Sequence, residues 1–185
     1  LDALQTQGDG AFKPLKRLAI ATGTARMPLR KTTPPNLQEA EEAVKWAETE
    51  LAAAVRDRAP IGTIKKLAEY KTWCEWVIRF FFNRYGMTEE QAKSKIWPID
   101  VSAMALNDVV LAGMVAEPGV QTSLRLRQQF GDRILTITEC NGDIGYMVPE
   151  DDIHNGGYEA TLSIISENGE ETLRNAVAEA IRKVL

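Results

Sequence analysis

A carboxylate and two phenols stand out among the side chains of this sequence that could do chemistry. Glu117 comes directly after a β-rich run, and functional sites are commonly built where strands end. Tyr146 and Tyr158 follow in a glycine-bearing stretch long enough to wrap a pocket. Histidine is the commonest metal ligand, but we expect His154 to be a solvated loop residue or one that supports a neighbouring group.

The order of features from Leu106 to Tyr158 is more informative than any one residue. A hairpin-like run ends in Val-Ala-Glu-Pro, with the Glu at position 117. Asn-Gly-Asp-Ile-Gly-Tyr-Met-Val-Pro then spans Asn141 to Pro149, and Gly-Gly-Tyr-Glu spans Gly156 to Glu159. This set resembles the neutral/alkaline ceramidase family, which has Gly-Glu-Pro after a strand, an Asn-x-x-x-Gly-Tyr-x-Pro loop and a Tyr-Glu pair. Pro28-Leu29-Arg30 also resembles a strand end of that family.

The resemblance implies a zinc-dependent amide hydrolase that holds only part of its metal site in this chain. In the family, two histidines from an earlier part of the domain, the Glu of Gly-Glu-Pro and the Tyr of Tyr-Glu bind the catalytic zinc. The last two correspond to Glu117 and Tyr158, while the sole histidine, His154, lies in the wrong part of the chain. The resemblance therefore implies that a preceding N-terminal part of the same protein supplies two His ligands. Tyr146 is a candidate to line the catalytic pocket.

Zinc suits such a ligand pair, because Zn²⁺ accepts carboxylate and phenolate oxygens and brings the pKa of a bound water near 7. Hydroxide formed in this way could attack an amide carbonyl. If the resemblance extends to specificity, the substrate is an N-acyl lipid such as ceramide, the protein is secreted or periplasmic, and the aromatic helix from Trp73 to Phe82 is a candidate wall of the lipid groove. Ala116 replaces the usual family Gly, and the segment after Tyr146 also departs from the family pattern, which leaves the substrate open.

Other interpretations of the same residues stay open. The hydrolase could act on a non-lipid amide or an ester, because fold does not dictate substrate. The chain could also be a non-catalytic scaffold that keeps the loops without a metal. Glu117 could simply cap the helix that follows it, and Tyr158 could be a loop residue that packs its ring and donates its hydroxyl to a backbone carbonyl.

Hydrophobic periodicity predicts an α/β fold, with a mixed or antiparallel sheet covered by helices and a helical hairpin inserted at about residues 37–86. We expect either one domain over residues 1–185 or the C-terminal part of a larger ceramidase-like catalytic domain. The predicted strands are Leu15–Leu29, interrupted near Gly23, a hairpin of Ile96–Leu106 and Val109–Val115, and Arg133–Thr138. The predicted helices are Gln38–Arg58, Thr63–Tyr85, Gly119–Phe130 and Glu170–Val184.

Composition excludes several classes of protein. The 185 residues carry a formal net charge of -4 with both signs interspersed, which argues against a nucleic-acid partner, because phosphate binding needs a concentrated basic surface. No apolar run approaches the roughly 20 residues that a membrane-spanning helix needs. Cys74 and Cys140 are expected to be free thiols rather than a disulfide. The apolar surface formed by Trp73, Trp76, Val77 and Phe80 is expected to be core, with contact to a partner or lipid as the alternative.

Overall fold

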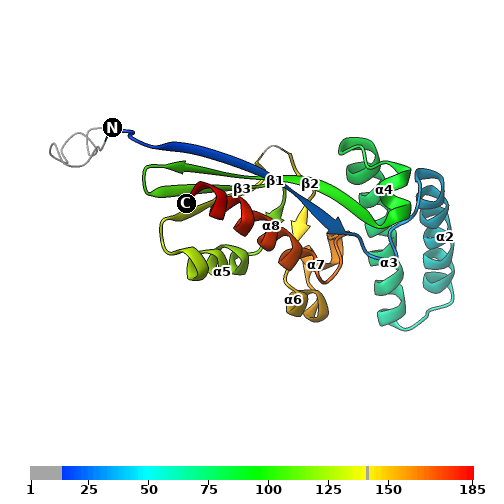
Figure 1. Cartoon of the computed structure of the whole chain (residues 1–185). Coiled ribbons are helices and arrows are strands. Elements are labelled where there is room, and N and C mark those ends of the chain that lie inside the picture. The colour runs from blue at the N-terminus through cyan, green and yellow to red at the C-terminus, as the bar shows by residue number, and fades with distance from the viewer. Residues whose placement is uncertain (1–13, 141) are drawn as a thin grey trace, which may run out of the picture.

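A four-stranded mixed sheet forms the centre of the protein (Figure 1). The structure is a computed structural model that describes residues 14–140 and 142–185, so Asn141, expected in a turn, lies outside the described residues. The strands lie in the order β1-β2-β3-β5. β1 pairs antiparallel with β2, β2 antiparallel with β3, and β3 parallel with β5, which confirms the mixed α/β fold. Their bounds are β1 Leu18–Pro28, β2 Ile96–Leu106, β3 Val109–Met114 and β5 Ile134–Ile137.

β1 is continuous, so the predicted interruption near Gly23 is wrong. Gly23 pairs with Val101, and the register runs unbroken from Leu18 opposite Leu106 to Pro28 opposite Ile96. A glycine weakens a strand because it contributes no side chain to the packing. Here the long antiparallel partner holds the strand on both sides of Gly23.

The turn between β2 and β3 was correctly predicted from Asn107-Asp108. Leu106 pairs with Val109 at the end of the two strands, so Asn107 and Asp108 alone form the loop. Asn107 has a φ of 55°, a left-handed conformation that asparagine tolerates better than most residues. Its side-chain oxygen also accepts hydrogen bonds from the backbone N–H groups of Lys16 and Arg17 at 2.8 and 3.1 Å. The turn therefore anchors the segment that enters β1.

Two helices cover one face of the sheet. α8 (Gly169–Val184) packs across β1, β2 and β3, and α5 (Val120–Phe130) packs against β5 and α8. The predicted apolar stripe of the last helix is confirmed, because Leu173, Val177 and Ile181 are all fully buried. Burial of these side chains at roughly 25 cal/mol per Å² of apolar area is what fixes α8 on the sheet.

The opposite face of the sheet is not covered by helices among the described residues. Ile20, Met104, Leu111 and Leu135 lie side by side across the four strands on that face. Ile20 and Leu135 are 66% and 48% exposed, whereas Met104 and Leu111 are half-buried between them. The expectation of a sheet covered by helices therefore holds for one face only.

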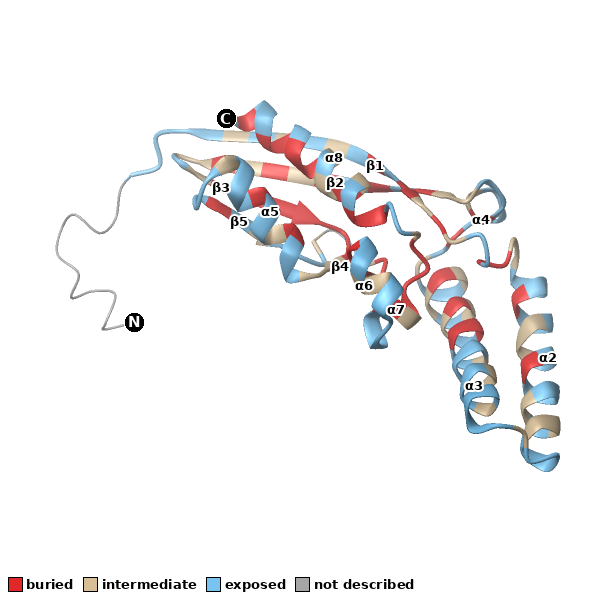
Figure 2. Cartoon of the chain, turned by 90° about the horizontal axis from the view of Figure 1, so that it is seen from below, coloured by how far each residue is buried: buried red, intermediate tan, exposed pale blue. Residues whose placement is uncertain are grey.

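A helical hairpin extends to one side of the sheet (Figure 2). α2 (Leu37–Arg56) packs along α3 (Ile61–Trp76), and α3 continues directly into a π-helical segment, η1 (Val77–Arg84). Trp73 and Val77 are buried, so the core interpretation of this aromatic surface is confirmed for them.

Phe81, at the far end of this continuous helix, joins the hairpin to the core. Its ring meets the ring of Trp97 on β2 edge to face at 5.9 Å. Trp76 and Phe80 are only partly buried at the edge of the same core.

Short elements interrupt the stretches that the sequence suggested were loops. α4 (Glu89–Ser94) begins with a capping box in which Thr88 and Gln91 exchange hydrogen bonds. The expected long glycine-bearing loop instead contains a two-residue strand and two short helices. These are β6 (Tyr146–Met147), α6 (Glu150–Asn155) and α7 (Tyr158–Leu162), and β6 pairs with a second two-residue strand, β4 (Glu117–Pro118).

Both cysteines are free thiols, as expected, and Cys74 is buried while Cys140 is partly exposed. Within residues 14–140 and 142–185, no helix combines the length and the apolar character that crossing a bilayer requires.

We expect Phe81→Ala to destabilise the fold by about 3–5 kcal/mol, because it leaves a cavity where the hairpin meets the sheet. Phe81 is 1% exposed and its ring also contacts that of Tyr85 at 5.8 Å. The free energy of unfolding in urea measures the loss. Val120→Ala, at a site that is 65% exposed, serves as the control and should change stability by no more than about 0.5 kcal/mol. Equal effects of the two substitutions would contradict this packing.

We expect iodoacetamide to alkylate Cys140 much faster than Cys74 in the folded chain. Burial raises the pKa of the Cys74 thiol, which lowers the fraction of reactive thiolate and also blocks access to the sulfur. Peptide mass spectrometry after timed labelling gives the two rates. Both thiols should react at similar rates once the chain is unfolded in urea, and equal rates in the folded chain would count against the burial of Cys74.

Candidate active site

Backbone pairing between β4 and β6 brings Glu117 beside Tyr146. The two residues are directly opposite in a short parallel ladder. The backbone N–H of Glu117 donates to the carbonyl oxygen of Gly145 at 3.0 Å, and that of Gly119 donates to the carbonyl oxygen of Met147 at 3.1 Å. Gly145 has a φ of 76°, a conformation that glycine adopts without strain, and its N–H donates to the Asp143 carboxylate at 2.6 Å. Gly145 therefore shapes the turn that leads into β6.

Tyr158, the first residue of α7, meets Tyr146 from the other side. The two rings lie edge to face with their centroids 5.7 Å apart. Tyr146 therefore lies between the other two candidate residues, in contact with Tyr158 through its ring and paired with Glu117 through its backbone. Tyr158 packs its ring, as the structural alternative expected, but it remains 61% exposed.

Glu117 and Tyr146 line one cleft of about 480 Å³, and Tyr158 lies at its border. The residues around the cleft are Glu117, Pro118, Gly119, Tyr146, Val148, Asp152, Gly156, Glu159 and Ala160. Tyr158 faces an adjoining groove of about 580 Å³ between α7 and α3, which Ala68, Thr72 and Leu162 also line. The structure thus places Tyr146 beside both Glu117 and Tyr158, whereas Tyr158 itself lines the adjoining groove and not the cleft that contains Glu117.

Three carboxylates crowd together at the end of β4. Glu117, Glu139 and Asp143 can place one oxygen each within 4.8 Å of one another. Burial raises the pKa of the Glu117 carboxyl, and the charges of Asp143 and Glu139 raise it further. Because like charges at this distance repel, the cluster is better suited to a cation than to an anion.

Tyr85, the residue that follows η1, contacts one carboxylate of the cluster. Its hydroxyl donates to the Asp143 carboxylate at 2.5 Å. Burial raises the pKa of this phenol, and its hydrogen bond to Asp143 raises it further. Sequence reasoning did not select Glu139, Asp143 or Tyr85. Asp143 lies inside the Asn-Gly-Asp-Ile-Gly-Tyr motif and could have been noticed there, whereas nothing in the sequence ties Tyr85 to it.

The Tyr146 phenol is electrostatically coupled to both neighbours. Burial raises its pKa, and the nearby Glu117 carboxylate and Tyr158 phenol raise it further. A protonated Tyr146 hydroxyl can donate a hydrogen bond to an oxygen bound in the cleft. Such a donor beside a carboxylate is a common combination in sites that bind carbonyl compounds.

The alternative in which Glu117 caps the following helix is wrong. Gly119 is the N-cap residue of α5, and no side chain donates or accepts at that cap. The Pro118-Gly119 step carries the chain away from Glu117 before the helix begins. The Glu117 carboxylate therefore does not cap α5, and it lines the cleft.

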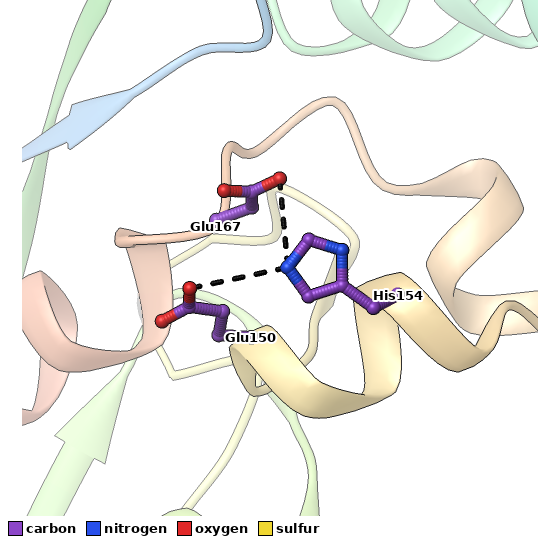
Figure 3. A group of neighbouring side chains, drawn as sticks. All are labelled: Glu150, His154 and Glu167. Atoms are coloured by element: carbon purple, nitrogen blue, oxygen red, sulfur yellow. Dashed lines mark ion pairs between the residues drawn. The ribbon is translucent and has the colours of Figure 1, made fainter.

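His154 lies outside the cleft, on the exposed surface of α6. Its nearest acidic groups are Glu150 and Glu167, as Figure 3 shows, rather than the cluster around Glu117. The expectation that it is solvated is confirmed, but His154 lies in α6 rather than in a loop.

Comparison with known proteins finds similarity only to solved structures. No family model matches the chain, and no curated protein matches it. A ceramidase structure described as complexed with C2 covers 46% of this chain, with a TM-score of 0.39 and 16% identity. The neutral ceramidase from Pseudomonas aeruginosa covers 48%, also with a TM-score of 0.39 and 16% identity. The chain spans only 15% and 16% of the lengths of those two chains.

We expect Glu117→Gln to raise the melting temperature at pH 7 in metal-free buffer. Because the folded-state pKa of Glu117 is raised, its contribution to stability is fully present below the ordinary value near 4.5 and is lost as the pH rises through the raised value. The neutral amide removes that penalty at pH 7, so the difference from the unchanged chain should shrink towards pH 4. Solvent screening of this partly exposed group keeps the effect to a few degrees.

Calorimetry across this pH range, with Glu50→Gln on α2 as the control, tests the prediction. Glu50 is exposed and lies on the outer part of the hairpin, so its substitution should leave the pH profile unchanged. A lower melting temperature for Glu117→Gln at pH 7 would show that the carboxylate is stabilised by its surroundings instead.

Proposed function

We propose that this chain forms part of a zinc-dependent hydrolase that cleaves an amide bond, with Glu117 and Tyr158 as zinc ligands and Tyr146 in the substrate pocket. One observation carries the proposal. Tyr146 is paired with Glu117 in the cleft and its ring contacts that of Tyr158, which lines the adjoining groove, so Tyr146 links the two candidate ligands. The same three residues carry the resemblance to the ceramidase motifs.

The donor set fits a divalent cation. Glu117 shares its surroundings with two further carboxylates, and a bound cation would relieve the repulsion that raises its pKa. Zinc bound there would supply a water of lowered pKa and polarise the substrate carbonyl. Two histidines from a preceding part of the same protein would complete the ligand set. In this proposal the chain contributes two of the four protein ligands.

The cleft itself favours a neutral substrate with a basic leaving group. Its charged lining residues are Glu117, Asp152 and Glu159, with no lysine or arginine among them. An amide enters uncharged, and the amine that leaves takes up a proton, so the acidic lining stabilises the product more than the substrate. In this proposal the Tyr146 hydroxyl, which lines the cleft, donates a hydrogen bond to the carbonyl oxygen of the amide.

For the substrate class we propose an N-acyl lipid, with the groove beside Tyr158 as the site of the acyl chain. Leu162 and Ala68 contribute apolar surface to this groove. The wall comes from the part of α3 between Lys65 and Thr72, whereas the predicted wall at residues 73–82 is largely taken up by the core, since Val77 and Phe81 are buried.

The intact protein that contains this chain is the material for the test. We expect Glu117→Ala and Tyr158→Phe each to lower its zinc content by up to one ion per molecule and to reduce amide hydrolysis by at least about 100-fold. Tyr70→Phe, which removes a phenol from α3 outside the cleft, should change neither quantity. Elemental analysis and a hydrolysis assay give the two readouts.

A panel of long-chain N-acyl amines, short amides and esters then decides the substrate. Preference for the long-chain amides supports the lipid proposal, and preference for short amides or esters supports a related zinc hydrolase. Folded protein that contains no zinc and hydrolyses none of the panel would overturn the enzyme proposal and favour a scaffold.

A further inference from the structure

A second group of metal-ligand side chains lies away from the cleft. Glu150 and His154 project from the same face of α6, and Glu167 approaches them from the segment before α8 (Figure 3). The His154 Nε2 atom is 3.9 Å from one carboxylate oxygen of each glutamate. All three donor atoms lie within 4.8 Å of one another. One imidazole and two carboxylates from two chain segments therefore converge on a single point.

Regular backbone structure positions all three side chains: α6 carries Glu150 and His154, and a turn carries Glu167. Glu150 and His154 are four residues apart on a helix, which places them on one face. Glu167 lies in a tight turn, closed by a 2.9 Å hydrogen bond from the N–H of Gly169 to the carbonyl oxygen of Ser166. The N–H of Ser166 in turn donates to the carbonyl oxygen of Pro28 at the end of β1. The turn that carries Glu167 is thus attached to the central sheet.

Nearby cations do not neutralise the two glutamates. Arg125 and Arg174 approach the same hollow, but both bind the buried carboxylate of Glu170, at 2.7 and 3.2 Å. Arg30 is close enough to Glu167 to interact electrostatically, yet its guanidinium donates to the carbonyl oxygens of Ile165 and Ala160. Two negative charges beside one imidazole therefore remain available to a cation.

We propose that Glu150, His154 and Glu167 bind a divalent transition-metal ion of the zinc type, at a site separate from that of Glu117. Ligand bonds of about 2.0–2.2 Å with tetrahedral angles put donor atoms about 3.4 Å apart, so the two 3.9 Å distances from His154 need to close by about 0.5 Å and the distance between the two carboxylates by up to about 1.4 Å. All three are exposed and have room for that movement. Imidazole nitrogen together with carboxylate oxygen suits Zn²⁺ better than Ca²⁺ or Mg²⁺, which prefer oxygen alone.

The ion would tie a weakly held helix to the rigid part of the fold. α6 has six residues and none of them is buried, so little apolar packing holds it in place. A metal bond to Glu167 would connect α6 to the turn attached to the end of β1. Because Tyr158 begins the next helix after Gly156 and Gly157, fixing α6 would also restrict the position of Tyr158. This site does not depend on the proposed hydrolase function.

Because the sequence contains a single histidine, every imidazole resonance in an NMR spectrum of this chain reports on the proposed site. We would titrate ¹⁵N-labelled 185-residue chain carrying Glu117→Ala with Zn²⁺ at pH 7.5 and follow the imidazole nitrogens by NMR. The expected result is a shift of the Nε2 resonance that saturates at one equivalent. An imidazole resonance that stays unmoved while zinc is added in excess would overturn the proposal.

Calorimetric titration of variants with Zn²⁺ provides the second measurement. His154→Ala and Glu167→Ala are each expected to weaken zinc binding about tenfold or more, while Glu179→Ala, on the exposed side of α8, leaves it unchanged. The changed side chains are exposed, and circular dichroism confirms that each variant folds. An unchanged zinc affinity in His154→Ala would show that this histidine binds no zinc and would overturn the proposal. The two proposals fail independently. Glu117→Ala should abolish hydrolysis and still show the imidazole shift, whereas His154→Ala should weaken zinc binding at this second site.

Discussion

Two backbone hydrogen bonds between β4 and β6 hold the candidate active site together. They join the N–H groups of Glu117 and Gly119 to the carbonyl oxygens of Gly145 and Met147. Each segment is short and would not be stable as an isolated strand, because a two-residue ladder contributes few contacts. The pairing persists because β3 leads into β4 from the buried side of the sheet, and Met114 and Met147 are both fully buried. The core of the protein thereby sets the register of the candidate residues Glu117 and Tyr146.

The electrostatics of the site follow from that register. Once Glu117 is placed beside β6, the turn that precedes β6 brings Asp143 towards it, and Glu139 closes the group. A fold that only had to be stable would separate three carboxylates, since each repels the others in a partly desolvated setting. Their retention is typical of a site whose charge has a use, and functional sites are where such unfavourable arrangements concentrate.

Sequence patterns predicted the regular elements well and the site only in part. Two features were predicted correctly because local residue spacing determines them. They are the buried stripe of Leu173, Val177 and Ile181 and the turn at Asn107-Asp108. The stretch from 146 to 162 was predicted as loop, because helices of five and six residues contain too few turns to show periodicity. Glu117 and Tyr158 were selected through motif resemblance, whereas their contact through Tyr146 depends on tertiary pairing that no local pattern encodes.

The same limit explains the residues that sequence reasoning missed. Tyr85 is far from Asp143 in the chain, and its contact exists only because η1 ends beside the β4–β6 pairing. The uncovered row across the sheet at Ile20 and Leu135 was likewise not anticipated. Alternation along a strand shows which side chains share a face, but it does not show whether anything packs on that face.

The unbroken course of α3 into η1 has a mechanical consequence. From Ile61, at the turn of the hairpin, to Arg84, the chain is one helical rod without a proline or glycine break after its first turn. The second half of this rod is fixed in the core, because Cys74, Val77 and Phe81 are all buried. The hydroxyl of Tyr85, one residue past the end of this rod, bonds to Asp143, so the helical hairpin is connected directly to the group of carboxylates that contains Glu117.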